Sequence, residues 1–126
     1  MNIATAQVES FLKEFKAAMN SAGIVIIDRE KNLQGMFDLE VNPRLREKVL
    51  KALKVKDYFR GPSTESGRVG EAWEFGKLVN GKEAYIKVSM GLAKTAAAQK
   101  EVAVPQKVIC ISFHLAEKPI TYPFKK

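Results

Sequence analysis

The stretch WEFGKLVNGKEAYIKVSM, residues 73–90, decides the fold, because two alternating runs flank the dipeptide Asn80-Gly81. Asn-Gly between such runs is the strongest short signal for a β-hairpin with a two-residue turn. That turn pairs Val79 with Lys82 and thereby sets the register of the whole hairpin. Side chains alternate across a strand, so one face of the hairpin is apolar. This face comprises Trp73, Phe75, Ala84, Ile86, Val88 and Met90.

The opposite face of the hairpin is polar. In the same register Glu74 lies opposite Lys87, and Tyr85 lies opposite Gly76, where no side chain competes for space. A carboxylate, a phenol and an ammonium group on one face form a candidate site. The same pattern also fits a surface tyrosine packed on the sheet beside an ordinary cross-strand ion pair. The residues alone leave both interpretations open.

The segments around the hairpin predict one α+β domain over residues 1–126. Apolar residues at helical spacing from Val8 to Met19 predict a first helix, with Thr5 as its cap and Gly23 as its stop. Asn42-Pro43 predicts the start of a second, basic helix over residues 43–60. Short strands are predicted over residues 24–28 and 36–41. We therefore expect a small antiparallel sheet, built on the central hairpin, that packs against two or three helices.

The last strong strand is predicted over residues 107–114. Alternation places Ile109, Ile111 and Phe113 on one side, with Cys110, Ser112 and His114 on the other. Turn residues predict a loop between residues 60 and 70, and residues 91–106 form a long connection. Two prolines in the tail, residues 116–126, favour an extended strap over a helix.

Charge and composition restrict the classes of function. The chain has 21 basic and 14 acidic residues, for a net charge of +7, and residues 42–60 hold seven basic and two acidic residues. Such a segment suggests a polyanion or an acidic protein as partner, although a solvated helix face has the same pattern. One cysteine and one histidine exclude a disulfide framework and a cluster of soft metal ligands. No phosphate-binding glycine motif is present, so we expect neither metal nor cofactor.

The start of the chain has no basic segment followed by an apolar core, as a secretory signal would have. The longest uninterrupted apolar stretch runs only from Ile24 to Ile27, too short to span a bilayer. Together with the single cysteine, these features lead us to expect a cytoplasmic protein that does not enter a membrane.

Cations, a phenol and an imidazole can cut RNA without a metal. The ribose 2′-OH attacks the adjacent phosphorus, which requires a base for this hydroxyl, an acid for the departing 5′-oxygen and cations for the phosphoryl oxygens. His114 has a side chain suited to proton transfer near neutral pH, although a histidine at a strand end is more often structural. The guanidinium of Arg60 offers a fork that suits phosphate oxygens.

Four short segments appear in an order that points to a family: LKVKDYFRG, AWEFGK, NGKEAYIKVSM and VICISFH, between residues 53 and 114. Together they resemble the toxins of the motility quorum-sensing regulator family, which are RelE-like messenger-RNA interferases of bacterial toxin–antitoxin systems. The resemblance covers about half of the chain. It implies a RelE-like fold, cleavage of messenger RNA in the cytoplasm, and a cognate antitoxin with a helix-turn-helix DNA-binding domain. A homodimer or a toxin–antitoxin complex is a further expectation.

The resemblance also implies roles for individual residues. The basic residue of the family at the helix end corresponds to Arg60, and its tyrosine corresponds to Tyr85, followed by Lys87 in the same strand. A glutamine of the family falls on Glu74, which would act as a general base or merely pair with Lys87. A lysine of the family falls on His114, which would replace a cation with an acid–base group. We expect these five residues to be catalytic. RNA-binding cations are expected at Lys54, Lys56 and Lys77.

Two hypotheses follow. The first is a metal-independent endoribonuclease toxin that uses these five side chains. The second is a non-catalytic module that binds RNA or an acidic protein through the basic helix 43–60.

Overall fold

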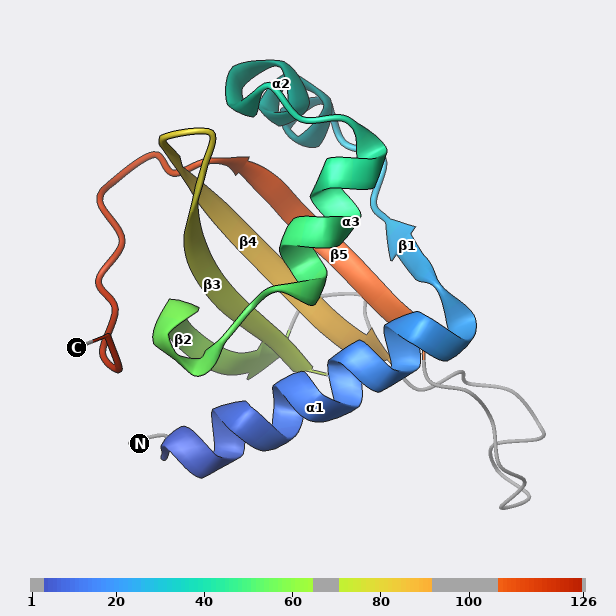
Figure 1. Ribbon diagram of the computed structural model, residues 1–126, viewed down its shortest axis with the longest axis vertical. Helices are drawn as coiled ribbons and strands as arrows, with labels where there is room; N and C mark the ends of the chain where they lie inside the picture. Colours follow the sequence, from blue (N-terminus) through green and yellow to red (C-terminus); the bar gives the residue numbers. More distant parts are fainter. Residues whose placement is uncertain (1–3, 65–70, 92–106, 126) are drawn as a thin grey trace.

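A five-stranded mixed sheet lies against helices in the computed structural model, which describes residues 4–64, 71–91 and 107–125 (Figure 1). The strand order is β1-β5-β4-β3-β2, and every neighbouring pair is antiparallel except β1 and β5, which run parallel. The α+β class is confirmed, while the expectation of a purely antiparallel sheet was wrong. The elements are α1 (Thr5–Ala22), β1 (Ile24–Ile26), α2 (Glu30–Leu39), α3 (Pro43–Lys51), η1 (Val55–Asp57), β2 (Tyr58–Thr64), β3 (Glu71–Val79), β4 (Lys82–Gly91) and β5 (Lys107–Leu115).

The central hairpin has the predicted register. Val79 pairs with Lys82, and the pairing continues along both strands. Asn80 and Gly81 have φ angles of 51° and 79°, in the left-handed region that a type I′ hairpin turn requires at both central positions. The Asn80 side chain also donates hydrogen bonds to the carbonyls of Leu39 and Glu40. The turn is thereby attached to the end of α2.

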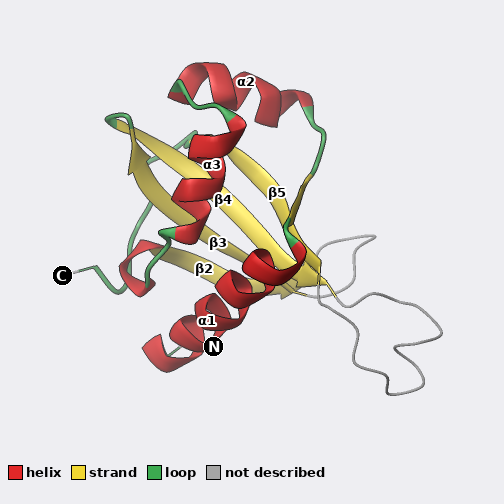
Figure 2. Cartoon of the chain, turned by 45° about the vertical axis from the view of Figure 1, so that its right-hand side comes forward, coloured by secondary structure: helices red, strands yellow, loops and turns green. Residues whose placement is uncertain are grey.

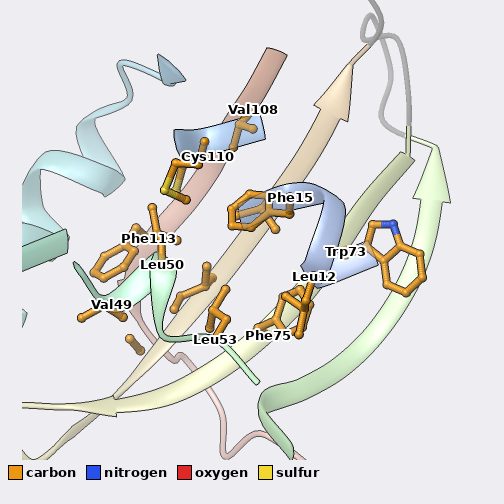
Figure 3. Close-up of a cluster of buried hydrophobic side chains, with 14 of the residues drawn as sticks. Leu12, Phe15, Val49, Leu50, Leu53, Trp73, Phe75, Val108, Cys110 and Phe113 are labelled. Carbon is orange, nitrogen blue, oxygen red and sulfur yellow. The ribbon is translucent and has the colours of Figure 1, made fainter. Parts of the chain in front are cut away.

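The core lies between one face of the sheet and the helices α1 and α3, which cross that face (Figures 1 and 2). The apolar residues predicted for the first helix are buried, and the ring of Phe11 stacks on that of Trp73 with a centroid distance of 4.6 Å. Gly23 ends α1 as predicted, but Thr5 is already helical and Ala4 occupies the cap position. Figure 3 shows labelled side chains of α1, α3, β3 and β5 meeting in one cluster.

A bulge in β5 changes the predicted alternation of that strand. Val88 pairs with Cys110, whereas Lys87 pairs with Ser112, so Ile111 is an extra residue without a partner in β4. Cys110 therefore lies in the core (Figure 3), although alternation placed it on the polar side. Its burial raises the pKa of the thiol to about 12. Ser112 returns to the polar side, as predicted.

Residues 36–41 were predicted as a strand but belong mainly to α2. The buried positions of this helix are Asn32, Gly35 and Leu39, whereas the apolar residues Leu33 and Phe37 are exposed. The helix packs on β5 through Gly35, where an added Cβ would lie 2.6 Å from the Cα of His114. Because a polar residue and a glycine form most of the packing face, the apolar pattern does not indicate a helix.

The predicted helix 43–60 is in fact three elements. Asn42 caps α3 as expected, because its side chain accepts a hydrogen bond from the amide of Leu45. The helix ends at Lys51, and the carboxylate of Asp57 accepts from the amide of Lys54 and stabilises the turn η1. Arg60 then lies in strand β2, which also includes the first part of the predicted loop. The rest of that loop and the connection over residues 92–106 lie outside the described residues.

Residues 116–125 form an extended segment with neither helix nor strand, here called the strap, as predicted for the tail. Both oxygens of Glu83 hold it, one accepting from the amide of Ile120 and the other from the hydroxyl of Tyr122. The strap fills the space above Gly76, where a Cβ would lie 2.5 Å from the Tyr122 hydroxyl. The space that we expected Tyr85 to use is therefore occupied by the strap. No helix in the described parts of the chain has the length and hydropathy needed to cross a membrane.

Candidate functional site

A cleft of about 530 Å³ opens on the polar face of the sheet, opposite the core. It lies among β2, β4, β5, the start of α2 and the strap, whose residues 116–121 form one wall. Four of the five predicted catalytic residues line it, namely Arg60, Tyr85, Lys87 and His114. The fold therefore gathers side chains that are more than 50 residues apart in the sequence.

Strand register explains why these residues meet. Arg60 pairs with Glu74, Glu74 with Lys87, and Lys87 with Ser112, so one row crosses four adjacent strands. Tyr85 and His114 pair in the neighbouring row, and their ring centroids are 5.3 Å apart. The bulge at Ile111 is essential to this alignment, because without it Ser112 and His114 would shift to the core side.

Glu74 lies beneath the cleft rather than in its lining. Its side chain is only 7% exposed, and its two oxygens accept hydrogen bonds from the Tyr85 hydroxyl, at 2.5 Å, and from Nε of Arg60, at 2.9 Å. The bond to Glu74 raises the pKa of Arg60, so this guanidinium stays cationic. The guanidinium also lies over the ring of Phe59, 4.8 Å from its centroid. Glu74 thus fixes the phenol and the guanidinium relative to each other.

His114 is buried and tied to the backbone. Its Nδ1 lies 2.8 Å from the carbonyl oxygen of Leu115. Since a carbonyl only accepts, Nδ1 carries a proton, and in the neutral ring Nε2 is the basic nitrogen. Burial lowers the pKa of His114, with smaller lowering by Lys31 and Arg29, and together these effects outweigh the opposing hydrogen bond to Leu115. The imidazole is therefore neutral at pH 7 and able to accept a proton.

Three further cations line the cleft that no sequence pattern indicated, namely Arg29, Lys31 and Lys118 of the strap. Arg29 precedes α2, and its Nη1 lies 3.3 Å from Oγ of Ser112 and 3.5 Å from the carbonyl of Ile111. Lys31, two residues later, forms an ion pair with Glu117 of the strap. The predicted strand over residues 24–28 stops just before Arg29, but nothing in the sequence shows that the chain turns there toward β5.

The three predicted RNA-binding lysines lie away from this cleft. Lys56 and Lys77 line a second cleft of about 310 Å³, together with Tyr122 and Lys125 of the strap. Lys77 forms an ion pair with Asp57 at 3.4 Å. Lys54 lines neither cleft and precedes the turn η1. The structure therefore does not bring these lysines together with the predicted catalytic residues.

Within residues 4–64, 71–91 and 107–125, no group of three or more His, Cys, Asp or Glu side chains could hold a metal ion. Comparisons with known protein families, curated proteins and solved structures found no match for the chain. The chemistry of the cleft is therefore inferred from its own residues.

Proposed function

We propose that the protein is a metal-independent endoribonuclease that cuts messenger RNA in this cleft, as the RelE-like toxins that its motifs resemble do. The observation that carries the proposal is the convergence of two cations, a phenol and a neutral imidazole in one cleft. Arg60 and Lys87 provide positive charge for phosphate oxygens, and Tyr85 and His114 provide groups for proton transfer. The proposed setting is the cytoplasm, with a cognate helix-turn-helix antitoxin as partner.

The geometry of the cleft supports one assignment of roles. Nε2 of His114 takes the proton of the ribose 2′-OH as this oxygen attacks the neighbouring phosphorus. The new O2′–P bond forms while the P–O5′ bond breaks, and the Tyr85 hydroxyl, turning from Glu74, donates its proton to the departing 5′-oxygen. Arg60 and Lys87 stabilise the charge that develops on the phosphoryl oxygens. The products have a 2′,3′-cyclic phosphate and a 5′-hydroxyl end.

Glu74 is a positioning residue in this proposal. Its carboxylate is buried and binds both Tyr85 and Arg60, so the general base expected at Glu74 is better assigned to His114. The carboxylate also limits how far Arg60 moves, since that side chain is otherwise 65% exposed.

The test is cleavage of a long single-stranded RNA in EDTA, with analysis of the product ends. The wild-type protein should release 2′,3′-cyclic phosphate ends, and Tyr85→Phe should lower the rate by about 10²–10⁴-fold, the usual contribution of a positioned acid. Tyr122→Phe is the matched control, because this tyrosine also donates to a glutamate but lies outside the cleft. Equal rates for the two variants would contradict the proposal.

Growth arrest provides a second readout. Inducing the wild-type protein should stop growth, and the double variant Tyr85→Phe with Arg60→Ala should restore it. Arg44→Ala, on the exposed side of α3, removes the same charge far from the cleft and should leave growth arrest unchanged. Full toxicity of the double variant would rule out this site.

A non-catalytic binding module is the second candidate, favoured by one observation. In the structure Glu74 engages both the Tyr85 hydroxyl and Arg60, as expected for a rigid binding surface. The basic segment 43–60 originally assigned to such binding is divided between α3, η1 and β2. Salt-sensitive RNA binding without any cleavage product in EDTA would favour this function over the nuclease.

A further inference from the structure

The cleft has a second cationic end on the same face of the sheet. It lies next to β5, whereas Arg60 lies in β2. The row Arg60, Glu74, Lys87 and Ser112 crosses β2 to β5, and Arg29 extends it beyond β5 through its contact with Ser112. Three strand spacings of about 4.8 Å separate Arg60 from Ser112, or about 14 Å in total. In a stacked duplex, successive phosphates of one strand advance by about 3.4 Å along the helix axis. The row is therefore longer than one nucleotide needs.

Arg29 is held in place by groups that are themselves rigid. Ser112 is 4% exposed, and its hydroxyl lies within hydrogen-bond distance of Nη1 of Arg29. The carbonyl of Ile111, at the bulge, lies near the same nitrogen. The side chain of Asn32, which is buried, hydrogen-bonds to Ile111 and to Phe113 and so fixes this part of β5. Both named contacts of Arg29 use Nη1, while Nη2 and Nε carry further donors that suit a phosphate.

The local charge favours an anion at this end. Lys31 also lines the cleft here, and Glu117, the acidic residue of this wall, is already in an ion pair with it. Arg29 and Lys118 add two further positive charges to the lining. The opposite end has Arg60 with its partner Glu74 beneath the surface. Positive charge therefore extends along the whole cleft and is not confined to the proposed catalytic end.

We propose that a single-stranded polynucleotide runs across the strands, with its scissile phosphate at Arg60 and Lys87 and a second phosphate at Arg29. Only the placement of the scissile phosphate rests on the proposed function. It makes Arg29 a residue that selects for substrate length, because a dinucleotide has no phosphate to reach it.

The test measures binding of 2′-O-methyl oligoribonucleotides of mixed sequence, two and eight nucleotides long, which cannot be cleaved because they lack the 2′-OH nucleophile. Arg29→Ala should weaken binding of the octanucleotide about tenfold. It should weaken binding of the dinucleotide less than about twofold. The slope of log K against log salt for the octamer should fall in magnitude by about 0.7, as expected for one lost contact to a single-stranded phosphate. Lys13→Ala, a charge-matched control on the exposed side of α1 and outside the cleft, should change neither quantity.

A second measurement begins with the wild-type protein alone. Octamers in which a methylphosphonate neutralises one phosphate at a time should bind the wild-type protein more weakly at one position besides the scissile one. That loss should disappear in Arg29→Ala. If no such position exists, or if Arg29→Ala behaves as Lys13→Ala does, the second phosphate site is wrong.

Cleavage of long RNA by the same wild-type preparation separates the two proposals. Cleavage without any effect of Arg29→Ala on octamer binding would overturn the inference and leave the nuclease standing. Length-selective binding through Arg29 without cleavage would support the phosphate track and overturn the nuclease.

Discussion

Replacing Glu74 by glutamine tests whether this buried carboxylate positions its neighbours or takes part in the chemistry. Glutamine has nearly the same shape as glutamate and keeps one oxygen as an acceptor. The replacement removes the negative charge that accepts from Tyr85 at 2.5 Å and from Arg60 at 2.9 Å. Glu71→Gln is the matched control, because this glutamate is exposed in the same strand.

The expected loss of stability follows from these two contacts. A hydrogen bond to a charged group contributes about 1.5–3 kcal/mol, and a neutral one about 0.5–1.5 kcal/mol, so the contact to Tyr85 loses about 1 kcal/mol. The side chain of Arg60 is 65% exposed, and solvent screening limits its ion pair to about 1 kcal/mol or less. Relief of the cost of burying a carboxylate offsets part of the sum. We expect a net decrease of about 1 kcal/mol in the free energy of unfolding.

Urea unfolding and RNA cleavage in EDTA measure the two consequences. Glu74→Gln should unfold at lower urea than Glu71→Gln, and it should retain activity within about tenfold, because a positioning role survives the loss of charge. A general base contributes about 10²–10⁴-fold. A loss of that size at unchanged stability would refute the positioning role and make Glu74 the base.

Three further predictions concern the elements that build the cleft. Asn32→Leu should lower the free energy of unfolding by about 3 kcal/mol or more, because the Asn32 side chain hydrogen-bonds to two carbonyls and one amide in a buried position. Gln34→Leu, on the exposed side of α2, is the control. Equal urea midpoints for the two variants would contradict the prediction. Gly76→Ala should cost about 1–3 kcal/mol by overpacking, because its Cβ would displace the strap; an unchanged urea midpoint would show that the strap does not pack as described. The folded-state pKa of His114 lies below its ordinary value of 6.5. As the pH falls through 6.5, the unfolded chain therefore takes up a proton before the folded chain does. The free energy of unfolding decreases in this range as a result. The difference in unfolding free energy between wild type and His114→Gln should thus change between pH 7 and 5, and a constant difference would refute the effect.

Local sequence determined the central hairpin completely. Asn80 and Gly81 are the residues whose backbones adopt positive φ at low cost, and a two-residue turn leaves one register for the strands that follow. The pairing of Glu74 with Lys87, the apolar face and the placement of Tyr85 on the polar face all follow from that turn. The first helix was equally clear, because its apolar residues recur at helical spacing.

Only the tertiary structure decided how this polar face becomes a cleft. The bulge at Ile111 moves Cys110 into the core and keeps Ser112 and His114 on the polar side, and it depends on packing against α2 that no local pattern specifies. The same packing brings in Arg29, while β2 brings Arg60 to Glu74. Turn chemistry acts over a few residues, whereas these contacts join segments up to 83 residues apart. The sequence thus determined which side chains share the hairpin face, and long-range packing determined their neighbours.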